Sequence, residues 1–441
     1  AKQIGDLKGE GAALGNLGNL YAALSDYPHA IEYQEQHLSI ARKIGDRHGE
    51  GIALGNLGNT YDCLGDYQSA LKHFQQSLEI ARLIGDRQSE ANNLGNIGLV
   101  LSHLSEYQRA ISYHERCLEK YREIGDQKGE GAALGNLGNV YENLGEYQRT
   151  IEYNNRHLVI ARMIGDRQGE AEALGNLGVA HSRLGNFSEA IQFFEQALSI
   201  FLQIGDHQGE GSAIGNLGNV YCSLGEYSRA IQYFEQRLDI ARRIGDRHGE
   251  GSTLGNLGIA YNNIGNYPLA IRYLEQRLII AQAIGDKQGE GSALGNIGLT
   301  YNSLLDYKRA INYFKKSLAI SRKLGDKAGI AGTCFNYAIS LCCLEQLDRA
   351  LPLAKEAATL FEEISSPLAA RARQLLAQLQ IGLSPAAPST DEVLREFEDI
   401  IQAVVDASHR NAKARQALEA FFPQLEQNGW HITGPIQQIW A

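Results

Sequence analysis

The chain has 441 residues, of which 44% are hydrophobic and 21% charged, a composition typical of a folded, soluble protein. Its net charge of −10 is modest for this length, acidic and basic residues alternate, and no apolar run reaches the length of a membrane span, so neither nucleic acid nor a membrane is an expected partner. The six cysteines form no CxxC pair and occupy no repeated position, which argues against a disulfide framework or a metal site and favours reduced thiols in the cytoplasm.

The first ten residues, AKQIGDLKGE, introduce a Gly-Asp pair that recurs every 40 residues, from Gly5-Asp6 to Gly325-Asp326, without one insertion. Gly favours the position just past a helix end, and Asp caps the start of the next helix. A second pair of this kind, such as Gly65-Asp66, lies halfway along several units. Each unit is therefore predicted to contain two helices of roughly 16–18 residues. Because AKQIGDLKGE matches the end of a second helix, we expect a further repeat to precede it.

Apolar residues within a unit follow helical spacing. In the unit that starts at residue 131, one set recurs at intervals of three and four in the first helix, and another set does so in the second helix. A two-helix hairpin cannot bury both stripes by itself, so consecutive hairpins are expected to stack into a solenoid. The two sets are Leu134, Leu137, Tyr141 and Leu144, and then Ile151, Leu158, Ala161 and Ile164.

The first helix of each unit contains a segment that would normally indicate a turn, ALGNLGNLY at Ala13–Tyr21 in the first unit. Glycines equivalent to Gly15 and Gly18 occur in eight units, and each interior glycine costs a helix about 1 kcal/mol relative to Ala. Such a cost is tolerable only where the missing side chains let helices approach closely. A phosphate-binding loop is the rival interpretation, but it needs a strand before the glycines, and no β-rich segment precedes any copy.

The pattern resembles the tetratricopeptide repeat, a family that places Leu-Gly-x-x-Tyr in its first helix and a small residue nine positions after the Tyr. Leu17-Gly18, Tyr21 and Ala30 match this motif, and the later units repeat the match. The usual unit has 34 residues, and the 40-residue form most resembles spindle-orientation adaptors of the Pins class and, more distantly, kinesin light chains. The resemblance implies an all-α fold, namely a right-handed α-solenoid of stacked antiparallel helix hairpins.

The period also predicts the division of the chain. Eight units are complete, a ninth has lost both glycines, and the segment after it can form a helix that caps the last hydrophobic face. The linker-like SPAAPST then leads into a helical tail, whose amphipathic helix is a candidate for self-interaction with the solenoid. The expected boundaries are a solenoid at 1–370 (partial unit 1–10, repeats 11–330, degenerate repeat 331–370), a capping helix at 371–383 and the C-terminal tail at 384–441.

Asparagines recur at two positions of the first helix, three residues apart and therefore on one helix face. Asn is a mediocre helix former, so its recurrence needs a reason. The resemblance implies that both positions face the concave groove, where amides clamp a ligand's backbone or carboxylate. The alternative is an internal ladder, in which each Asn bonds an adjacent helix, and the two arrangements can coexist. The candidate peptide-binding residues are Asn16, Asn19, Asn56, Asn59, Asn96, Asn136, Asn139, Asn176, Asn216, Asn219, Asn256 and Asn296.

The groove positions that vary between units, equivalent to Ala12, Ala22 and Ala23, are mostly small and neutral. The Pins-class adaptors carry arginines near the start of this helix, whereas this chain has Gly, Ala or Ser there. We therefore expect a protein or peptide ligand that is weakly charged and held mainly through its backbone, with binding that depends only mildly on salt.

Other polar residues have structural interpretations. Charges that follow the turns, such as Arg47 and Glu50, are interpreted as solvated helix-start residues. His37 and His157 share a second-helix position with Arg237 and Ser77, so a ligand role for these histidines is not expected.

The function predicted from these features is that of a non-catalytic scaffold that binds an extended peptide or a helical segment in the groove. The alternative is a sensor arm of a larger signalling NTPase or protease whose catalytic domain lies outside this chain. An enzyme is not expected, because no Ser/His/Asp, Cys/His, metal or phosphate constellation is present. No cofactor is expected.

Overall fold

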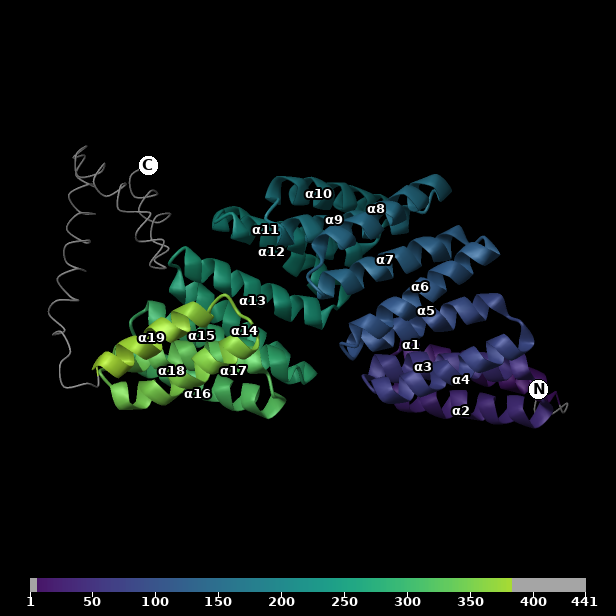
Figure 1. Ribbon diagram of the computed structural model, residues 1–441, viewed down its shortest axis with the longest axis horizontal. Helices are drawn as coiled ribbons and strands as arrows, with labels where there is room; N and C mark the ends of the chain where they lie inside the picture. The colour runs from purple at the N-terminus through teal and green to yellow at the C-terminus, as the bar shows by residue number, and fades with distance from the viewer. Residues whose placement is uncertain (1–5, 383–441) are drawn as a thin grey trace. The chain divides into compact units, whose positions relative to one another are not determined.

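The structure is a computed structural model that describes residues 6–382, and all regular elements in that range are α-helices. The expectations for residues 1–5 and for the tail at 384–441 lie outside the described residues. Figure 1 shows the helices following one another as antiparallel hairpins. The chain divides into two compact units, one up to Val220 and one from Tyr221. The all-α solenoid architecture expected from the period is confirmed.

Every hairpin pairs a first helix with a second helix, each of 16 to 18 residues in the units described. The first helices are α1 (Leu7–Ala23), α3 (Arg47–Leu64), α5 (Arg87–His103), α7 (Gln127–Asn143), α9 (Arg167–Arg183), α11 (His207–Ser223), α13 (Arg247–Asn263), α15 (Lys287–Ser303) and α17 (Lys327–Cys342). The second helices are α2 (Tyr27–Ile44), α4 (Tyr67–Ile84), α6 (Tyr107–Ile124), α8 (Tyr147–Ile164), α10 (Phe187–Ile204), α12 (Tyr227–Ile244), α14 (Tyr267–Ile284), α16 (Tyr307–Leu324) and α18 (Leu347–Glu363), and α19 (Ala369–Gly382) follows them.

The Gly-Asp pairs end one helix and start the next, as the sequence predicts. Gly45 takes the left-handed conformation at φ 73°, which costs glycine little, and the Asp46 carboxylate accepts a hydrogen bond from the backbone N–H of Gly49 at 3.0 Å. The turn inside a hairpin does not require glycine. Ser25 and Leu305 adopt positive φ values of 60° and 59° at the position where other repeats have Gly. Caps of this kind fix the helix ends at the same positions in each repeat.

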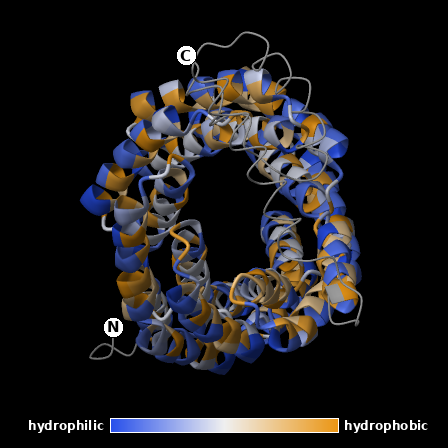
Figure 2. Ribbon diagram, turned by 90° about the vertical axis from the view of Figure 1, so that its left-hand side faces the viewer, coloured by the Kyte–Doolittle hydropathy of each residue, from blue (hydrophilic) through white to orange (hydrophobic). Residues whose placement is uncertain are grey.

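The core lies between the two helices of each hairpin and between consecutive hairpins. The largest fully buried side chains include Phe74, Phe194, Phe234 and Phe314, which occupy one position of the second helix in four repeats. Hydrophobic and hydrophilic residues alternate along the helix ribbons, as expected for helices that bury one face (Figure 2). The last second helix, α18, is covered by α19, whose Leu379 packs with Ala350 and Ala354.

Two layers result within each unit. First helices of consecutive repeats contact one another, as α7 does with α9 and α13 with α15, whereas consecutive second helices make sparser contacts. The first helices therefore form the inner layer of each unit and the second helices the outer layer. The asparagine positions lie on the inner layer.

The interpretation of the turn charges as solvated residues is wrong for the glutamates. Glu50 is buried, and its carboxylate accepts hydrogen bonds from Arg42 at the end of α2 and from Arg47 at the start of α3, both at 2.8 Å. Burial alone would raise the pKa of Glu50, but the bonds from the two arginines outweigh burial and lower it. The same Arg–Glu pair joins consecutive repeats at Arg82–Glu90, Arg122–Glu130, Arg162–Glu170 and Arg242–Glu250.

Replacing Glu50 by Gln should lower the free energy of unfolding of the adjoining repeats by about 1.5 kcal/mol at neutral pH, because two charge-assisted hydrogen bonds are weakened. The folded pKa of Glu50 is lowered, so its contribution is present above the unfolded pKa of about 4.3 and is lost as the pH falls towards the folded value. Denaturant unfolding at neutral and at acidic pH measures both effects. Glu119→Gln, at an exposed position, is the control, and an equal loss in the two variants would contradict the prediction.

Candidate functional site

The asparagines of the inner layer differ in exposure between their two positions. Members of the first position are half-buried from Asn56 to Asn296, and Asn16 in the first hairpin is exposed. The second position is exposed at Asn19, Asn59, Asn139 and Asn219. The first-position amides from Asn56 to Asn296 are thus only partly buried, and the second-position amides are exposed.

Some asparagines bond a side chain of the second helix. The Asn176 amide donates to Oδ1 of Asn154 at 3.1 Å, and the Asn56 amide makes a weak bond of 3.5 Å to Oε1 of Gln34. The same Gln34 donates to Oδ1 of Asn19 at 2.8 Å. These amides form part of an internal ladder.

The remaining candidate asparagines fall into two groups according to their interaction partners. Asn219 and Asn256 also have interaction partners. Among the described residues, no hydrogen-bond partner is found for the side chains of Asn16, Asn59, Asn96, Asn136, Asn139, Asn216 and Asn296.

The residue 22 positions upstream, on the preceding second helix, provides the partner of two first-position asparagines. Asn176 and Asn56 have the polar residues Asn154 and Gln34 there, and both form a bond. Asn96 has Phe74 instead, so its amide finds no partner on that helix. In these three repeats, whether the amide is bonded therefore follows the polarity of the second-helix side chain.

The second glycine of each pair allows the close helix contact predicted from the sequence. A Cβ added to Gly58 would lie 2.7 Å from the Phe74 ring, and one added to Gly178 would lie 2.6 Å from the Phe194 ring. Real Cβ contacts are longer than this, so the two helices pack closely only because these residues lack a side chain.

The first glycine faces a different second-helix position, which we call the crevice position. A Cβ on Gly15 would lie 2.8 Å from His37, but a Cβ on Gly55 would lie 3.6 Å from Ser77, and one on Gly175 would meet nothing within 4 Å. Close packing therefore does not require this glycine in every repeat. The crevice position holds His37, Ser77, Cys117, His157, Ala197, Arg237, Arg277, Ser317 and Ala357.

A crevice opens on the inner layer at two places where the crevice position is serine. Near Ser77, α3, α4 and α5 enclose about 180 Å³, and near Ser317, α15, α16 and α17 enclose about 370 Å³. The lining positions of the smaller crevice match those of the larger one 240 residues later, which is six repeats. Three candidate asparagines border the first crevice, Asn56, Asn59 and Asn96, and Asn296 borders the second.

These crevices were not predicted from the sequence. The sequence shows that the residue at the crevice position varies in size between repeats. Only the structure shows that this position lies opposite the first glycine. The Ser77 hydroxyl donates to the carbonyl oxygen of Gly51 at 2.9 Å, and the Ser317 hydroxyl donates to that of Gly291 at 2.8 Å. Each serine therefore lies flat against the first helix and leaves the crevice open.

Buried histidines at the crevice position fill the space instead. Burial lowers the pKa of His37 and of His157, which keeps both rings neutral near pH 7. No group of three or more His, Cys, Asp or Glu side chains in residues 6–382 is placed to hold a metal ion. Within the same range, no helix combines the length and apolarity needed to cross a bilayer.

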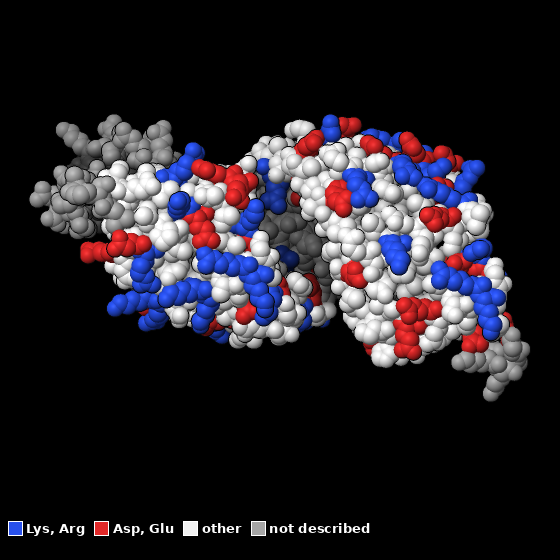
Figure 3. Space-filling model, turned by 60° about the horizontal axis from the view of Figure 1, so that its bottom comes forward, with Lys and Arg blue, Asp and Glu red and all other residues white. Residues whose placement is uncertain are grey.

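On the face shown in Figure 3, Lys and Arg side chains predominate over the lower left part, and wide uncharged areas separate charges of both signs on the right. The inner-layer site in residues 6–382 is a row of amides, glycines and small hydroxyl side chains, which can donate and accept hydrogen bonds.

Stacked helical hairpins of constant length define an α-solenoid repeat protein. A tetratricopeptide repeat model matches residues 10–83, 65–123, 87–163, 129–203, 170–243, 210–283 and 250–323. The chain belongs to the tetratricopeptide repeat family, which supplies protein-interaction scaffolds and is generally non-catalytic. No curated protein matches the sequence.

Solved structures share this fold at low sequence identity. The apo form of the quorum sensor NprR from B. thuringiensis is 13% identical with a TM-score of 0.54, over 82% of this chain and 99% of that one. A STAND protein with a tetratricopeptide repeat sensor from Pyrococcus horikoshii is 15% identical with a TM-score of 0.52, over 86% of this chain and 54% of that one. A Rap protein complexed with competence and sporulation factor is 18% identical with a TM-score of 0.51, over 70% of this chain and 87% of that one. At these identities the likeness establishes the fold alone.

Proposed function

We propose that the chain is a non-catalytic scaffold that binds an extended, weakly charged peptide segment along the inner layer. The candidate asparagines that have no partner among the described residues hold the backbone of this segment, and the crevices take its side chains. Each primary amide both donates and accepts, so it matches a peptide unit whatever the ligand's sequence.

One observation carries the proposal. Asn96 and Asn136 are half-buried on the inner layer, and their amides have no hydrogen-bond partner among the described residues. A polar group that is partly removed from water without a partner weakens a fold, and a ligand that supplies the partner recovers that free energy. The Rap protein with bound competence and sporulation factor shows that this fold accommodates a ligand.

The test uses a phage-displayed library of random peptides selected on the full chain, followed by binding measurements on the enriched peptides. Replacing Asn96, Asn136 and Asn139 together by Ala should weaken binding about 100-fold, since three hydrogen bonds of about 1 kcal/mol each are lost. The melting temperature should stay close to that of the wild type. Binding should change little between low and high salt.

Asn176→Ala is the matched control, because its amide already bonds Asn154 inside the protein. This variant should lose stability and keep most of its peptide affinity. The proposal fails if no peptide is enriched on the wild-type chain, or if the triple variant binds the selected peptides as tightly as the wild type.

A sensor arm of a larger signalling NTPase is the second candidate. The STAND protein combines a repeat sensor of this fold with further sequence, and the alignment covers about half of that protein. In such a protein the proposed peptide would act as the signal. Adding a selected peptide to the product of the complete gene and measuring NTP hydrolysis distinguishes a sensor arm from a free-standing scaffold.

A further inference from the structure

The outer-layer helix α16 differs in charge from the other second helices. It contains six basic side chains and no acidic one, whereas each of the other eight second helices contains at least one Asp or Glu. The chain as a whole has a net charge of −10, so this helix is a local exception. All of its basic side chains are exposed, namely those of Lys308, Arg309, Lys315, Lys316, Arg322 and Lys323.

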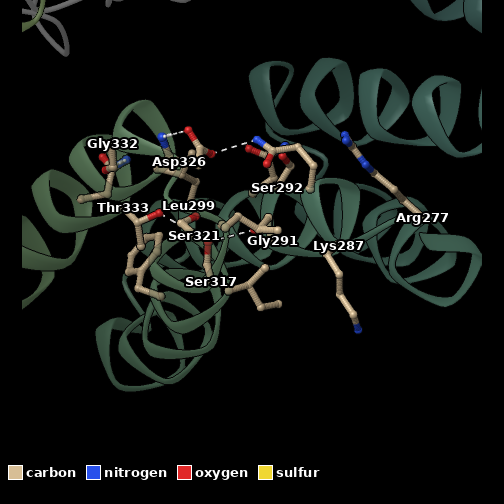
Figure 4. Close-up of a pocket in the computed structure, with 18 residues that line it drawn as sticks. Arg277, Lys287, Gly291, Ser292, Leu299, Ser317, Ser321, Asp326, Gly332 and Thr333 are labelled. Carbon is tan, nitrogen blue, oxygen red and sulfur yellow. Dashed lines mark hydrogen bonds between the residues drawn. The ribbon is translucent and has the colours of Figure 1, made fainter. Parts of the chain in front are cut away.

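These basic side chains lie on the face of α16 that points away from the inner layer. Ser317 and Ser321 of the same helix border the crevice beside α15 (Figure 4), and Phe314 is fully buried. In Figure 1, α16 lies at the lower edge of its unit. Figure 3 turns that side towards the viewer, and Lys and Arg predominate there, at the lower left. The cations are therefore on the outer surface, apart from the row of asparagines.

The cations occur in pairs at regular intervals along α16. Lys308-Arg309, Lys315-Lys316 and Arg322-Lys323 follow one another every seven residues, which is two helical turns or about 10.5 Å. The exposed residues between the pairs, Asn312 and Ala319, are uncharged. Together the three pairs form a strip about 22 Å long, which we call the basic strip.

The other repeats show that the fold does not require this charge. The position of Lys315 holds Glu in five other second helices, and the position of Ala319 is acidic in three. The charge at the centre of α16 is therefore reversed relative to most repeats, while the helix and its buried face are the same. The equivalents are Glu35, Glu115, Glu195, Glu235 and Glu275 at the first position, and Glu79, Glu119 and Asp239 at the second.

Three lysines of the basic strip have no counter-charge. No ion pair of Lys308, Lys315 or Lys323 is found among the described residues, whereas the two arginines of the strip pair with Asp306 and Glu356. The helix dipole favours Lys323 in the last turn, but it disfavours Lys308 in the first turn and does not act on Lys315 at the centre. Interactions within the chain therefore do not explain these lysines, and an anionic partner would.

Acidic residues on both sides of the strip limit the shape of that partner. On α18, Asp348, Glu356, Glu362 and Glu363 outnumber two basic residues, and α14 carries the exposed Glu275. A broad anionic surface, such as a lipid bilayer or a nucleic-acid duplex, would meet these carboxylates as well as the strip, and they would repel it. A narrow anionic segment can follow the strip alone.

We propose that the basic strip is a second interaction surface, which binds an acidic segment of a partner protein along α16. An exposed ion pair contributes only about 0.5 kcal/mol, so affinity requires several carboxylates at matching intervals, and salt weakens it. This surface goes beyond the proposed function, because it lies on the outer layer and takes a charged ligand, whereas the inner-layer site takes a weakly charged one.

Fluorescence anisotropy on the full chain tests the basic strip. The probe is a labelled peptide of alanine and glutamine that carries a pair of glutamates every seven residues, and the same peptide with Gln in place of every Glu is the neutral control. We expect saturable binding of the acidic peptide that weakens about tenfold from low to high salt, and no binding of the neutral peptide.

Two variants separate binding from folding. Replacing Lys308, Lys315 and Lys323 together by Gln should weaken binding about tenfold, since three exposed ion pairs of about 0.5 kcal/mol each are lost. The melting temperature should stay close to that of the wild type, because these side chains are exposed. Lys315→Glu introduces the residue that five other repeats have at this position, so it should keep the fold and weaken binding by repulsion.

The matched control replaces Lys43, Lys72 and Lys128 together by Gln. These lysines are also exposed, no ion pair of theirs is found among the described residues, and they belong to the other compact unit. The control changes the net charge by the same amount and should leave binding unchanged. The variant with Ala at Asn96, Asn136 and Asn139 should also bind the acidic peptide normally, which separates this surface from the inner-layer site.

The basic strip is refuted if the acidic peptide does not bind the wild type, if the neutral peptide binds equally, or if the control triple variant loses as much affinity as the strip variant. Single-stranded oligothymidine and phosphatidylserine vesicles are the rival probes. If either binds more tightly than the acidic peptide, and loses that binding in the strip variant, the assignment of a protein partner is overturned. Failure of the random-peptide selection on the inner layer would leave the strip unaffected.

Discussion

Gly58→Leu should lower the free energy of unfolding of its hairpin by about 3 kcal/mol, because the new side chain would overfill a closely packed helix contact. A Cβ at this position already lies 2.7 Å from the ring of Phe74, and that ring is fully buried and cannot move aside. Hydrogen exchange resolved along the chain is the appropriate measurement, since a repeat stack can unfold locally. Protection should fall in α3 and α4 first.

The other glycine of the same pair provides the control. Gly55→Ala puts a Cβ 3.6 Å from the Ser77 hydroxyl, an ordinary contact, and it replaces a poor helix former by the best one. This variant should gain about 1 kcal/mol. Opposite signs at two glycines three residues apart are the expected result, and destabilisation of similar size at both would contradict the assignment of their roles.

His114→Phe should remove an acid sensitivity from the hairpin of α5 and α6. His114 is fully buried, neither ring nitrogen has a hydrogen-bond partner in the described residues, and burial lowers its pKa to about 4. The unfolded chain takes up a proton near pH 6.5, whereas the folded chain does so only near pH 4. Stability is therefore intact above pH 6.5 and is lost as the pH falls towards 4, by about 3 kcal/mol in total.

Phenylalanine occupies the same position in four other repeats, so the substitution should be well packed. A Cβ on Gly98 would lie 2.6 Å from the His114 ring, much as one on Gly58 would lie 2.7 Å from Phe74, which indicates similar room for either ring. The reciprocal change, Phe74→His, should introduce the same sensitivity one repeat earlier. Unfolding curves between pH 7 and pH 4 measure both. A wild-type hairpin whose stability is unchanged over this range would contradict the explanation.

The helix bounds and caps could be predicted because they depend on local chemistry. A glycine that accepts positive φ and an aspartate that binds free N–H groups act within a few residues, so the period of Gly45-Asp46 and its equivalents determines where helices end. The contact of Gly58 with the second helix also followed, because an unfavourable residue repeated in a helix needs a packing reason.

The hydrogen bond of Asn176 could not be predicted, since it depends on a residue of another helix. Asn96 and Asn176 lie in nearly identical segments, yet only Asn176 is bonded, because its neighbour on the preceding hairpin is Asn154 rather than Phe74. The burial of Glu50 was missed for the same reason. Its two arginine partners lie on either side of a turn. The sequence of the turn alone predicts that all three charged side chains are solvated.

The uniform length of the repeats has a consequence for how such a chain can change over generations. Unequal crossing-over between genes would add or delete whole 40-residue blocks, and each block would carry its own caps and its own crevice position. A block with Ser or Arg at that position would carry this side chain to a new place in the array. Its caps would preserve the contacts with the neighbouring repeats. Binding specificity in this architecture can therefore be rearranged by shuffling, as well as by point substitution.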